Sequence, residues 1–309
     1  MNYEIHLIIL TLYCCPLILA TRGTYRPIIG ILAQEQDAPA NNSYIPSSYV
    51  KAVESSGARV VPIFINESLQ YYQEMMAALN GIVLPGGNVN LTATTGFARS
   101  ANIVFDIATQ INDQGDHFPL LGVCQGMQKL AILTNDNKNL LRACPGMRNI
   151  ALALRFKPGY RRASLYATAS RRNLITLTSW NSTANHHQWC VTEKNLTALG
   201  LEKYWRVLSI NTDGEHKEFI SSMQAYKYPY VGVQFHPEKV SFEWSITQNN
   251  PHSMLAIKAN RLFYDWLVQE ARQNKHHFND SKKEKSALIY NYQQVYTGSE
   301  GDFEQQYVF

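Results

Sequence analysis

One cysteine lies where an apolar run meets a helix-like run. Cys124 stands between Gly122 and Gly126, after FPLLGV and before MQKLAIL. This Gly-x-Cys-x-Gly spacing is the thiol counterpart of the nucleophile elbow, in which glycines let a strand and a helix approach closely. A helix that begins here favours the thiolate, and the backbone N–H of Gln125 would face a developing oxyanion. The pattern therefore predicts a cysteine nucleophile.

A histidine that could serve as its base follows a later apolar run. The segment GVQFHPE places His236 after a strand-like stretch and Glu238 two residues further on. His236 would take the thiol proton and later protonate the leaving amine, while Glu238 would orient the imidazole. The segment LPGG adds Gly86 and Gly87, whose N–H groups could complete the oxyanion hole. Each motif is common by itself, but their order and strand context together predict a Cys–His–Glu triad.

The elements that must position these residues follow a regular pattern. Short apolar runs alternate with segments of helical spacing up to about residue 140, which predicts an α/β fold with a mostly parallel central sheet covered by helices on both faces. Beyond that point, turn signals predict additional β-hairpin elements, one of them around Asp213-Gly214. Because open parallel sheets bind ligands at the carboxyl ends of their strands, Cys124 stands where such a fold would place a site. The apolar runs are RPIIGILAQ, ARVVPIFI, GIVLPGG, FPLLGV and YPYVGVQF.

The first twenty residues differ from the rest of the chain. LIILTLYCCPLILA is apolar but short for a membrane span, so residues 1–20 are interpreted as a cleaved signal peptide, with an uncleaved anchor as the alternative. Residues 21–309 are expected to form a single domain with a polar C-terminal tail from about residue 275, which either wraps the surface or is partly loose. Six N-x-S/T triplets favour a secreted glycoprotein; they begin at Asn41, Asn66, Asn90, Asn181, Asn195 and Asn279.

The number of cysteines and the distribution of charged residues restrict the possible functions further. If Cys124 stays free, Cys144 and Cys190 either pair in the oxidising secretory pathway or remain two buried thiols. A net charge of +4 is too small to indicate a nucleic-acid binder. No acidic residue lies between Asp136 and Glu193, although that interval holds nine Lys and Arg residues. These cations are either solvated surface charges or a field that attracts a polyanionic substrate.

The motifs also carry a family likeness over nearly the whole mature chain. The Cys124 and His236 motifs resemble the class I glutamine amidotransferase-like superfamily. Longer stretches resemble its gamma-glutamyl hydrolase (folylpolyglutamate hydrolase) family. These are RPIIGILAQE, SYVKAVESSGARVVPIFINE, GIVLPGGN, NHHQWCV, NTDG, AYKYPYVGVQFHPEK and EKSALIYNY. The resemblance implies an omega peptidase that cleaves folate and antifolate polyglutamates without metal or cofactor. It also implies a secreted and lysosomal homodimer, and substrate contacts from Asn88, His186 and His187.

The residues support this chemistry and leave alternatives open. A γ-glutamyl amide is a glutamine side-chain amide with a larger leaving amine, so the thiol of Cys124 would form a thioester with it and release that amine. A hydrolase of other γ-glutamyl conjugates and a glutaminase-type amidotransferase subunit share the triad, and a binding protein with a relic pocket remains a non-enzymatic alternative. No nucleic-acid partner and, after signal cleavage, no membrane partner is expected. The choice between terminal and internal cleavage of the tail stays open.

Overall fold

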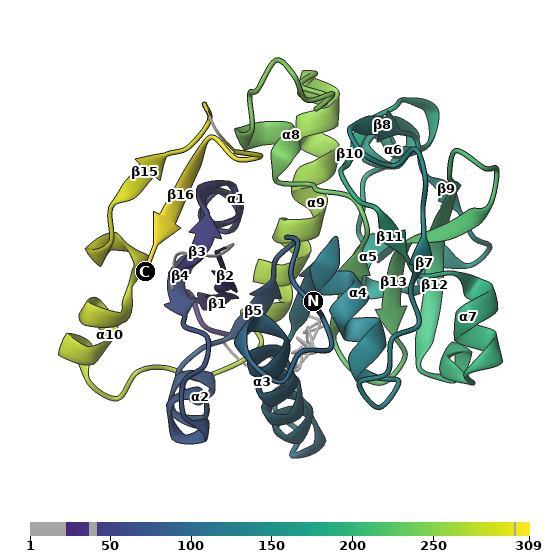
Figure 1. Ribbon diagram of the computed structural model, residues 1–309. Coiled ribbons are helices and arrows are strands. Elements are labelled where there is room, and N and C mark those ends of the chain that lie inside the picture. The colour runs from purple at the N-terminus through teal and green to yellow at the C-terminus, as the bar shows by residue number, and fades with distance from the viewer. Residues whose placement is uncertain (1–22, 37–41, 300) are drawn as a thin grey trace, which may run out of the picture.

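The computed structural model describes residues 23–36, 42–299 and 301–309, and an eight-stranded sheet forms their centre (Figure 1). Five neighbouring strands run parallel and three further strands join them antiparallel. This confirms the predicted α/β fold with a mostly parallel sheet. In spatial order the strands are β4 (Arg59–Ile63), β1 (Ile28–Leu32), β5 (Gly81–Leu84), β6 (Leu120–Val123), β14 (Tyr230–Val233), β13 (Glu218–Ala225), β12 (Trp205–Thr212) and β9 (Arg155–Phe156).

The two faces of the sheet bury different apolar clusters. Ile29 and Ile31 belong to one cluster, whereas Ile28 and Leu32 belong to the other, because successive side chains of a strand point to opposite faces. The first cluster includes residues of α1 and α9, and the second includes residues of α2, α3 and α4. Helices therefore cover both faces, as the sequence predicted.

The described helices are mostly short. The α-helices are α1 (Ser47–Ser55), α2 (Leu69–Met76), α3 (Gly96–Asp113), α4 (Gln125–Leu133), α5 (Ser164–Ala167), α6 (Arg171–Ser179), α7 (Glu193–Ala198), α8 (Lys239–Phe242), α9 (Met254–Ala271) and α10 (Ser281–Ala287). Short 3-10 helices are η1 (Tyr160–Arg162), η2 (Leu201–Lys203) and η3 (Ile289–Asn291). No helix in the described ranges is both long and apolar enough to span a bilayer.

Hairpins and small sheets surround the central sheet. Strands β12 and β13 form the predicted hairpin, in which the Asp213 N–H donates to the Lys217 carbonyl at 2.9 Å. Two further antiparallel pairs are β7 (Arg142–Ala143) with β11 (Trp189–Cys190), and β8 (Ile150–Leu152) with β10 (Thr183–Asn185). A disulfide joins Cys144 to Cys190 and fastens the first pair, which settles the alternative left open for these two cysteines.

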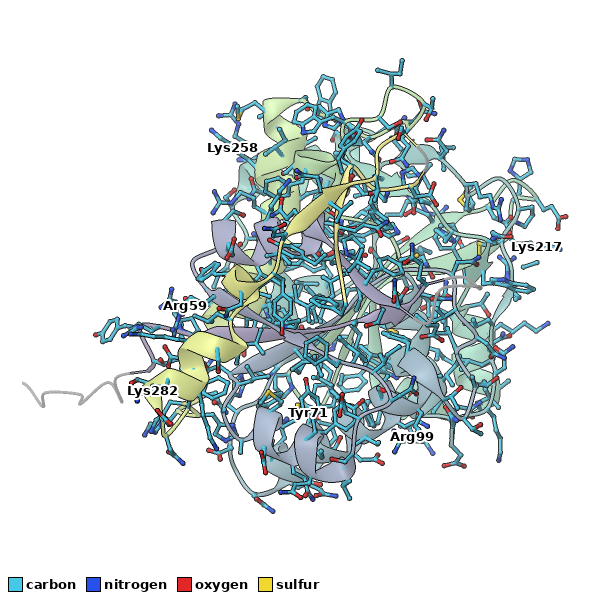
Figure 2. The ribbon with its side chains drawn as sticks, turned by 60° about the vertical axis from the view of Figure 1, so that its left-hand side comes forward. Arg59, Tyr71, Arg99, Lys217, Lys258 and Lys282 are labelled. Atoms are coloured by element: carbon cyan, nitrogen blue, oxygen red, sulfur yellow. A yellow bond between two sulfur atoms is a disulfide. The ribbon has the colours of Figure 1, made fainter. Side chains whose placement is uncertain are left out.

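The described residues of the polar tail form regular elements that pair with the rest of the chain. It contributes α10, β15 (Gln294–Tyr296) and β16 (Gln305–Val308), and β16 pairs with β3 (Ser43–Pro46), which in turn pairs with β2 (Gln34–Glu35). Figure 2 shows Arg59 of β4 beside α10, where it forms an ion pair with Glu284. The signal peptide predicted for residues 1–20 lies outside the described residues.

Candidate active site

Cys124 occupies a strained bend between β6 and α4. Its φ of 52° lies in a region that side-chain-bearing residues rarely adopt, and its N–H donates to the Val233 carbonyl at 2.7 Å. A Cβ added to Gly126 would overlap the Leu84 carbonyl oxygen, and one added to Gly122 would lie 2.6 Å from the Gly126 oxygen. Only glycine therefore allows this close approach of strand and helix, which fixes the thiol at the end of the sheet.

The fold brings the predicted triad together. Strands β6 and β14 are parallel neighbours, so their carboxyl ends place Cys124 and His236 side by side. Gly86 lies beside both residues, since a Cβ there would lie 2.7 Å from His236 Cε1 and 3.0 Å from Cys124 Cβ, and His236 Nδ1 lies 2.6 Å from Glu238 Oε1. His236 and Glu238 are only 3% and 1% exposed, so water does not screen their interaction.

The charge state of His236 follows from these neighbours. Burial by itself would lower the pKa of His236, but the Glu238 carboxylate and the Cys124 sulfur favour the cation and raise this pKa to about 9. The imidazole is therefore protonated at neutral pH. Gln234 adds an amide N–H donated to the Cys124 sulfur at 3.8 Å, which stabilises negative charge there. The arrangement therefore places an imidazolium beside the Cys124 sulfur.

Two tyrosines support the triad, and sequence reasoning did not single them out. The Tyr49 hydroxyl of α1 lies 3.3 Å from His236 Nδ1, and the Tyr264 hydroxyl of α9 donates to Glu238 Oε2 at 3.3 Å. Burial, followed by the negative charge of Glu238, raises the pKa of both phenols well above the usual value. The available signal was their position on the buried faces of two apolar helices, where a hydroxyl needs a partner.

The backbone donors expected for an oxyanion hole differ in availability. The Gly86 N–H donates to the Tyr49 hydroxyl at 2.8 Å. This N–H is therefore engaged within the fold, and the oxyanion role of Gly86 stays a prediction. Gly86 also makes room for the triad, since a Cβ there would lie 2.7 Å from His236 Cε1 and 3.0 Å from Cys124 Cβ. Gly87 and Gln125 both line the cleft beside Cys124 and remain candidates.

A cleft of about 510 Å³ opens above the triad and includes the expected substrate-binding residues Asn88, His186 and His187 in its lining. His186 Nε2 lies 2.8 Å from Asn250 Oδ1, and His187 Nδ1 lies 3.1 Å from the Trp189 carbonyl. Burial lowers the pKa of both histidines to about 3, and the positive charge of His236 contributes in the same direction. Both are therefore neutral and offer hydrogen bonds rather than charge.

Two basic residues also line the cleft, Arg148 and Lys239. Arg148 is exposed, and it is the one member of the acid-free basic interval in the lining. Four other members pair with carboxylates instead, in the ion pairs Lys138–Asp136, Arg142–Asp213, Arg155–Glu218 and Lys157–Glu193. The interval is therefore mostly a set of surface charges away from the cleft.

The predicted glycosylation sites differ in exposure. Asn66, Asn90, Asn181 and Asn279 are exposed, whereas Asn41 lies outside the described residues. Asn195 is half-buried, and its Nδ2, the atom that would bear a glycan, donates to the Leu140 carbonyl at 2.6 Å.

Known proteins with similar sequences span almost the whole chain. Residues 27–238 match the Peptidase C26 family. The chain is 42% identical over 291 residues to the gamma-glutamyl hydrolase of Mus musculus, covering 93% of this chain and 90% of that protein. It is 38% identical over 289 residues to the Homo sapiens gamma-glutamyl hydrolase, covering 92% and 90%. It is 32% identical over 288 residues to gamma-glutamyl hydrolase B of Dictyostelium discoideum, covering 92% and 83%. The chain therefore belongs to the gamma-glutamyl hydrolase family of C26 peptidases.

Proposed function

We propose that this chain hydrolyses the γ-glutamyl bonds of folate and antifolate polyglutamates through a thioester on Cys124. The observation that carries this proposal is that Cys124, held at a strained bend, and His236 lie side by side at the carboxyl ends of two parallel strands and line the same open cleft. Family membership supports the γ-glutamyl bond as the target. Glu238, Tyr49 and Tyr264 hold the imidazole in place for the reaction.

The acylation step uses the ion pair directly. The Cys124 thiolate attacks the γ-carbonyl carbon, a C–S bond forms, and the carbonyl oxygen becomes an oxyanion. Backbone N–H groups of Gln125 and Gly87 are the proposed donors to this oxyanion. The oxyanion then collapses, the C–N bond breaks, and the His236 imidazolium gives its proton to the leaving amine. The enzyme is left as a thioester with a neutral imidazole.

The deacylation step follows from the changed charge at Cys124. Once the sulfur is acylated, its negative charge no longer raises the pKa of His236, so the neutral imidazole becomes accessible. His236 takes a proton from water, whose oxygen attacks the thioester carbonyl. The C–S bond breaks, a carboxylic acid leaves, and the thiolate–imidazolium pair is restored.

The decisive experiment incubates wild type and Cys124→Ala with folate pentaglutamate and separates the products by length. We expect wild type to shorten the tail and the variant to lose at least about 10⁴-fold in rate. An α-linked pentaglutamate of folate is the matched substrate control and should remain intact. Cleavage by Cys124→Ala at the wild-type rate, or equal cleavage of the α-linked tail, would contradict the proposal. Wild-type cleavage of other γ-glutamyl conjugates but not of the folate substrate would replace it with the broader hydrolase.

We further propose that residues 1–20 are removed and that residues 21–309 form one domain of a secreted and lysosomal glycoprotein that assembles as a homodimer. The exposed Asn66, Asn90, Asn181 and Asn279 support glycan attachment, and Asn41 is expected to be modified on its sequon alone. Asn195 is expected to be the least occupied, because its Nδ2 is committed to the fold. Mass spectrometry of protein secreted from cultured cells, before and after enzymatic deglycosylation, tests each site and the new N-terminus. Light scattering tests the dimer.

A further inference from the structure

One side of the cleft is formed by a segment that has no regular structure. Residues 85–95 join β5 to α3 without helix or strand, and they carry Gly87 and Asn88 of the cleft lining. A backbone N–H stabilises a developing oxyanion only if it is already in place before the reaction. What fixes the main chain of this segment beside Cys124 therefore needs an explanation.

The side chain of Gln125 pairs with the main chain of this segment. The Val89 N–H donates to Gln125 Oε1 at 3.1 Å, and Gln125 Nε2 donates to the Val89 carbonyl at 2.7 Å. The carboxamide thus exchanges two hydrogen bonds with one residue, as a neighbouring strand would. Only one orientation of the amide satisfies both bonds, because its oxygen accepts and its nitrogen donates. Gln125 is 9% exposed, so water competes little for these bonds.

Two further side chains hold the segment on either side of this pair. Lys129 lies one turn further along α4, is fully buried, and donates from Nζ to the Leu91 carbonyl and to Asn137 Oδ1, both at 2.8 Å. Towards β5, Gln34 Nε2 donates to the Pro85 carbonyl at 3.3 Å. Side chains of α4 therefore hold the half of the segment that lies away from β5.

We propose that the side chain of Gln125 sets the geometry of the oxyanion hole by fixing the Gly87 N–H relative to the N–H of Gln125 itself. This inference rests on the proposed function, in which these two groups are the donors. Gln125 follows Cys124 directly, so the bend at Cys124 places its backbone. Val89 is two residues beyond Gly87, so its two bonds to Gln125 leave Gly87 little freedom. Gln125 is in this respect a positioning residue, because its side chain acts through Gly87 and not on the substrate.

Gln125→Leu tests this role, because it removes both side-chain bonds and keeps the backbone N–H. With folate pentaglutamate we expect kcat to fall by about 10- to 100-fold and KM to change by less than about threefold, since the oxyanion exists only after attack. Alkylation of Cys124 by iodoacetamide provides the second readout. That reaction puts no charge on a carbonyl oxygen, so its rate and pH dependence should stay at the wild-type values.

Gln125→Glu provides a conservative variant that pH can switch. A protonated carboxyl group can accept the Val89 N–H and donate its O–H to the Val89 carbonyl, whereas a carboxylate has no donor. The usual pKa of about 4.3 should be raised here by burial and by the facing carbonyl oxygen. We therefore expect kcat relative to wild type to be highest at acidic pH and to fall as pH rises through this pKa. The matched control is Gln110→Leu on the exposed side of α3, which should behave as wild type in every assay.

The outcomes separate this inference from the proposed function. If Gln125→Leu keeps the wild-type kcat, or loses kcat and the alkylation rate in equal proportion, the positioning role is wrong while hydrolysis stands. If wild type cleaves neither folate pentaglutamate nor a γ-glutamyl anilide, the proposed function itself fails. Should Gln125→Leu not fold, Gln125→Glu decides, since a ratio to wild type that does not change with pH overturns the proposal.

Discussion

At the scale of single residues, the environment of His236 determines how the site responds to pH. An imidazole with the ordinary pKa of about 6.5 would change charge within the physiological range. Here the Glu238 carboxylate and the Cys124 sulfur outweigh burial and keep the imidazole charged well above that range. The imidazolium that would protonate the leaving amine is therefore present at acidic pH as well.

The pH profile should show this directly. Because the pKa of His236 is raised to about 9, the imidazolium persists at all lower pH values and is lost as pH rises through about 9. We expect kcat/KM to remain substantial at about pH 5 and to decline on the alkaline side near this pKa. Initial rates with a γ-glutamyl substrate across the full range provide the measurement. A profile that collapses below about pH 6 would contradict the ion pair.

Glu238→Gln should separate two roles of Glu238, namely the orientation of the His236 imidazole and the negative charge that favours its protonated form. The amide keeps a similar shape but removes the negative charge that favours the imidazolium, so the alkaline limit of activity should move to lower pH. We expect kcat to fall by about 10²- to 10⁴-fold, by analogy with the loss of the carboxylate from a serine-protease triad. Tyr264→Phe is the matched control, because it removes only the hydroxyl that donates to Glu238 Oε2 and should cost less. An unshifted alkaline limit in Glu238→Gln would assign the high pKa to another group.

At the scale of elements, a small strand pair builds one wall of the cleft. Strands β7 and β11 are only two residues long each, yet the segment around β11 supplies His186, His187 and Trp189 to the cleft lining. So short a pair has few ladder hydrogen bonds of its own. The Cys144–Cys190 disulfide fastens it, and the Cys144 N–H donates to the Gln188 carbonyl at 2.7 Å.

Removing this disulfide should loosen the wall without touching the triad. For the double variant Cys144→Ser/Cys190→Ser we expect a loss of about 2–4 kcal/mol in the free energy of unfolding, together with a larger change in KM than in kcat. Urea unfolding followed by fluorescence measures the first, and steady-state kinetics the second. Wild type treated with a mild reductant serves as the chemical control. Unchanged stability in both samples would mean that strand pairing alone holds the wall.

At the scale of the whole molecule, Arg148 is the one residue of the basic interval that lines the cleft in the described part of the chain. Arg148 lines the cleft, whereas Arg171 and Arg172 belong to α6 and lie outside the lining. Exposed charges farther than about 10 Å from a substrate are largely screened at physiological salt. We therefore assign any charge-based binding of the distal tail to Arg148.

Tail length provides the readout for this assignment. Arg148→Gln should raise KM more for folates with long glutamate tails than for those with short ones, and the difference should shrink at high salt. Arg172→Gln is the matched control, because it removes the same charge from an exposed position outside the cleft lining. Equal effects of the two variants at every tail length would indicate a diffuse field instead.

The sequence by itself determined which segments form the buried parallel strands, and it predicted which groups react. Apolar runs ending in glycine at Gly86 and Gly122 predicted buried parallel strands, because such strands are covered on both faces and need no polar positions. Cys124, His236 and Glu238 were predicted because each follows such a strand, and parallel strands end at a common edge. The hairpin at Asp213 followed from its turn residues in the same local way.

Only the tertiary structure decided which groups surround those atoms. Tyr49 and Tyr264 come from helices whose periodicity marks a buried face but not the partner it meets. Lys239 begins a helix of four residues, which is too short for any periodicity to mark a face. Gly86 lies in a Pro-Gly-Gly turn, whose sequence predicts a backbone donor for the oxyanion. In the structure, its N–H donates to the Tyr49 hydroxyl of α1. Whether Cys144 and Cys190 pair depended on a distance between two strands far apart in the chain. Such contacts join segments whose spacing in the sequence is arbitrary, so no local pattern encodes them.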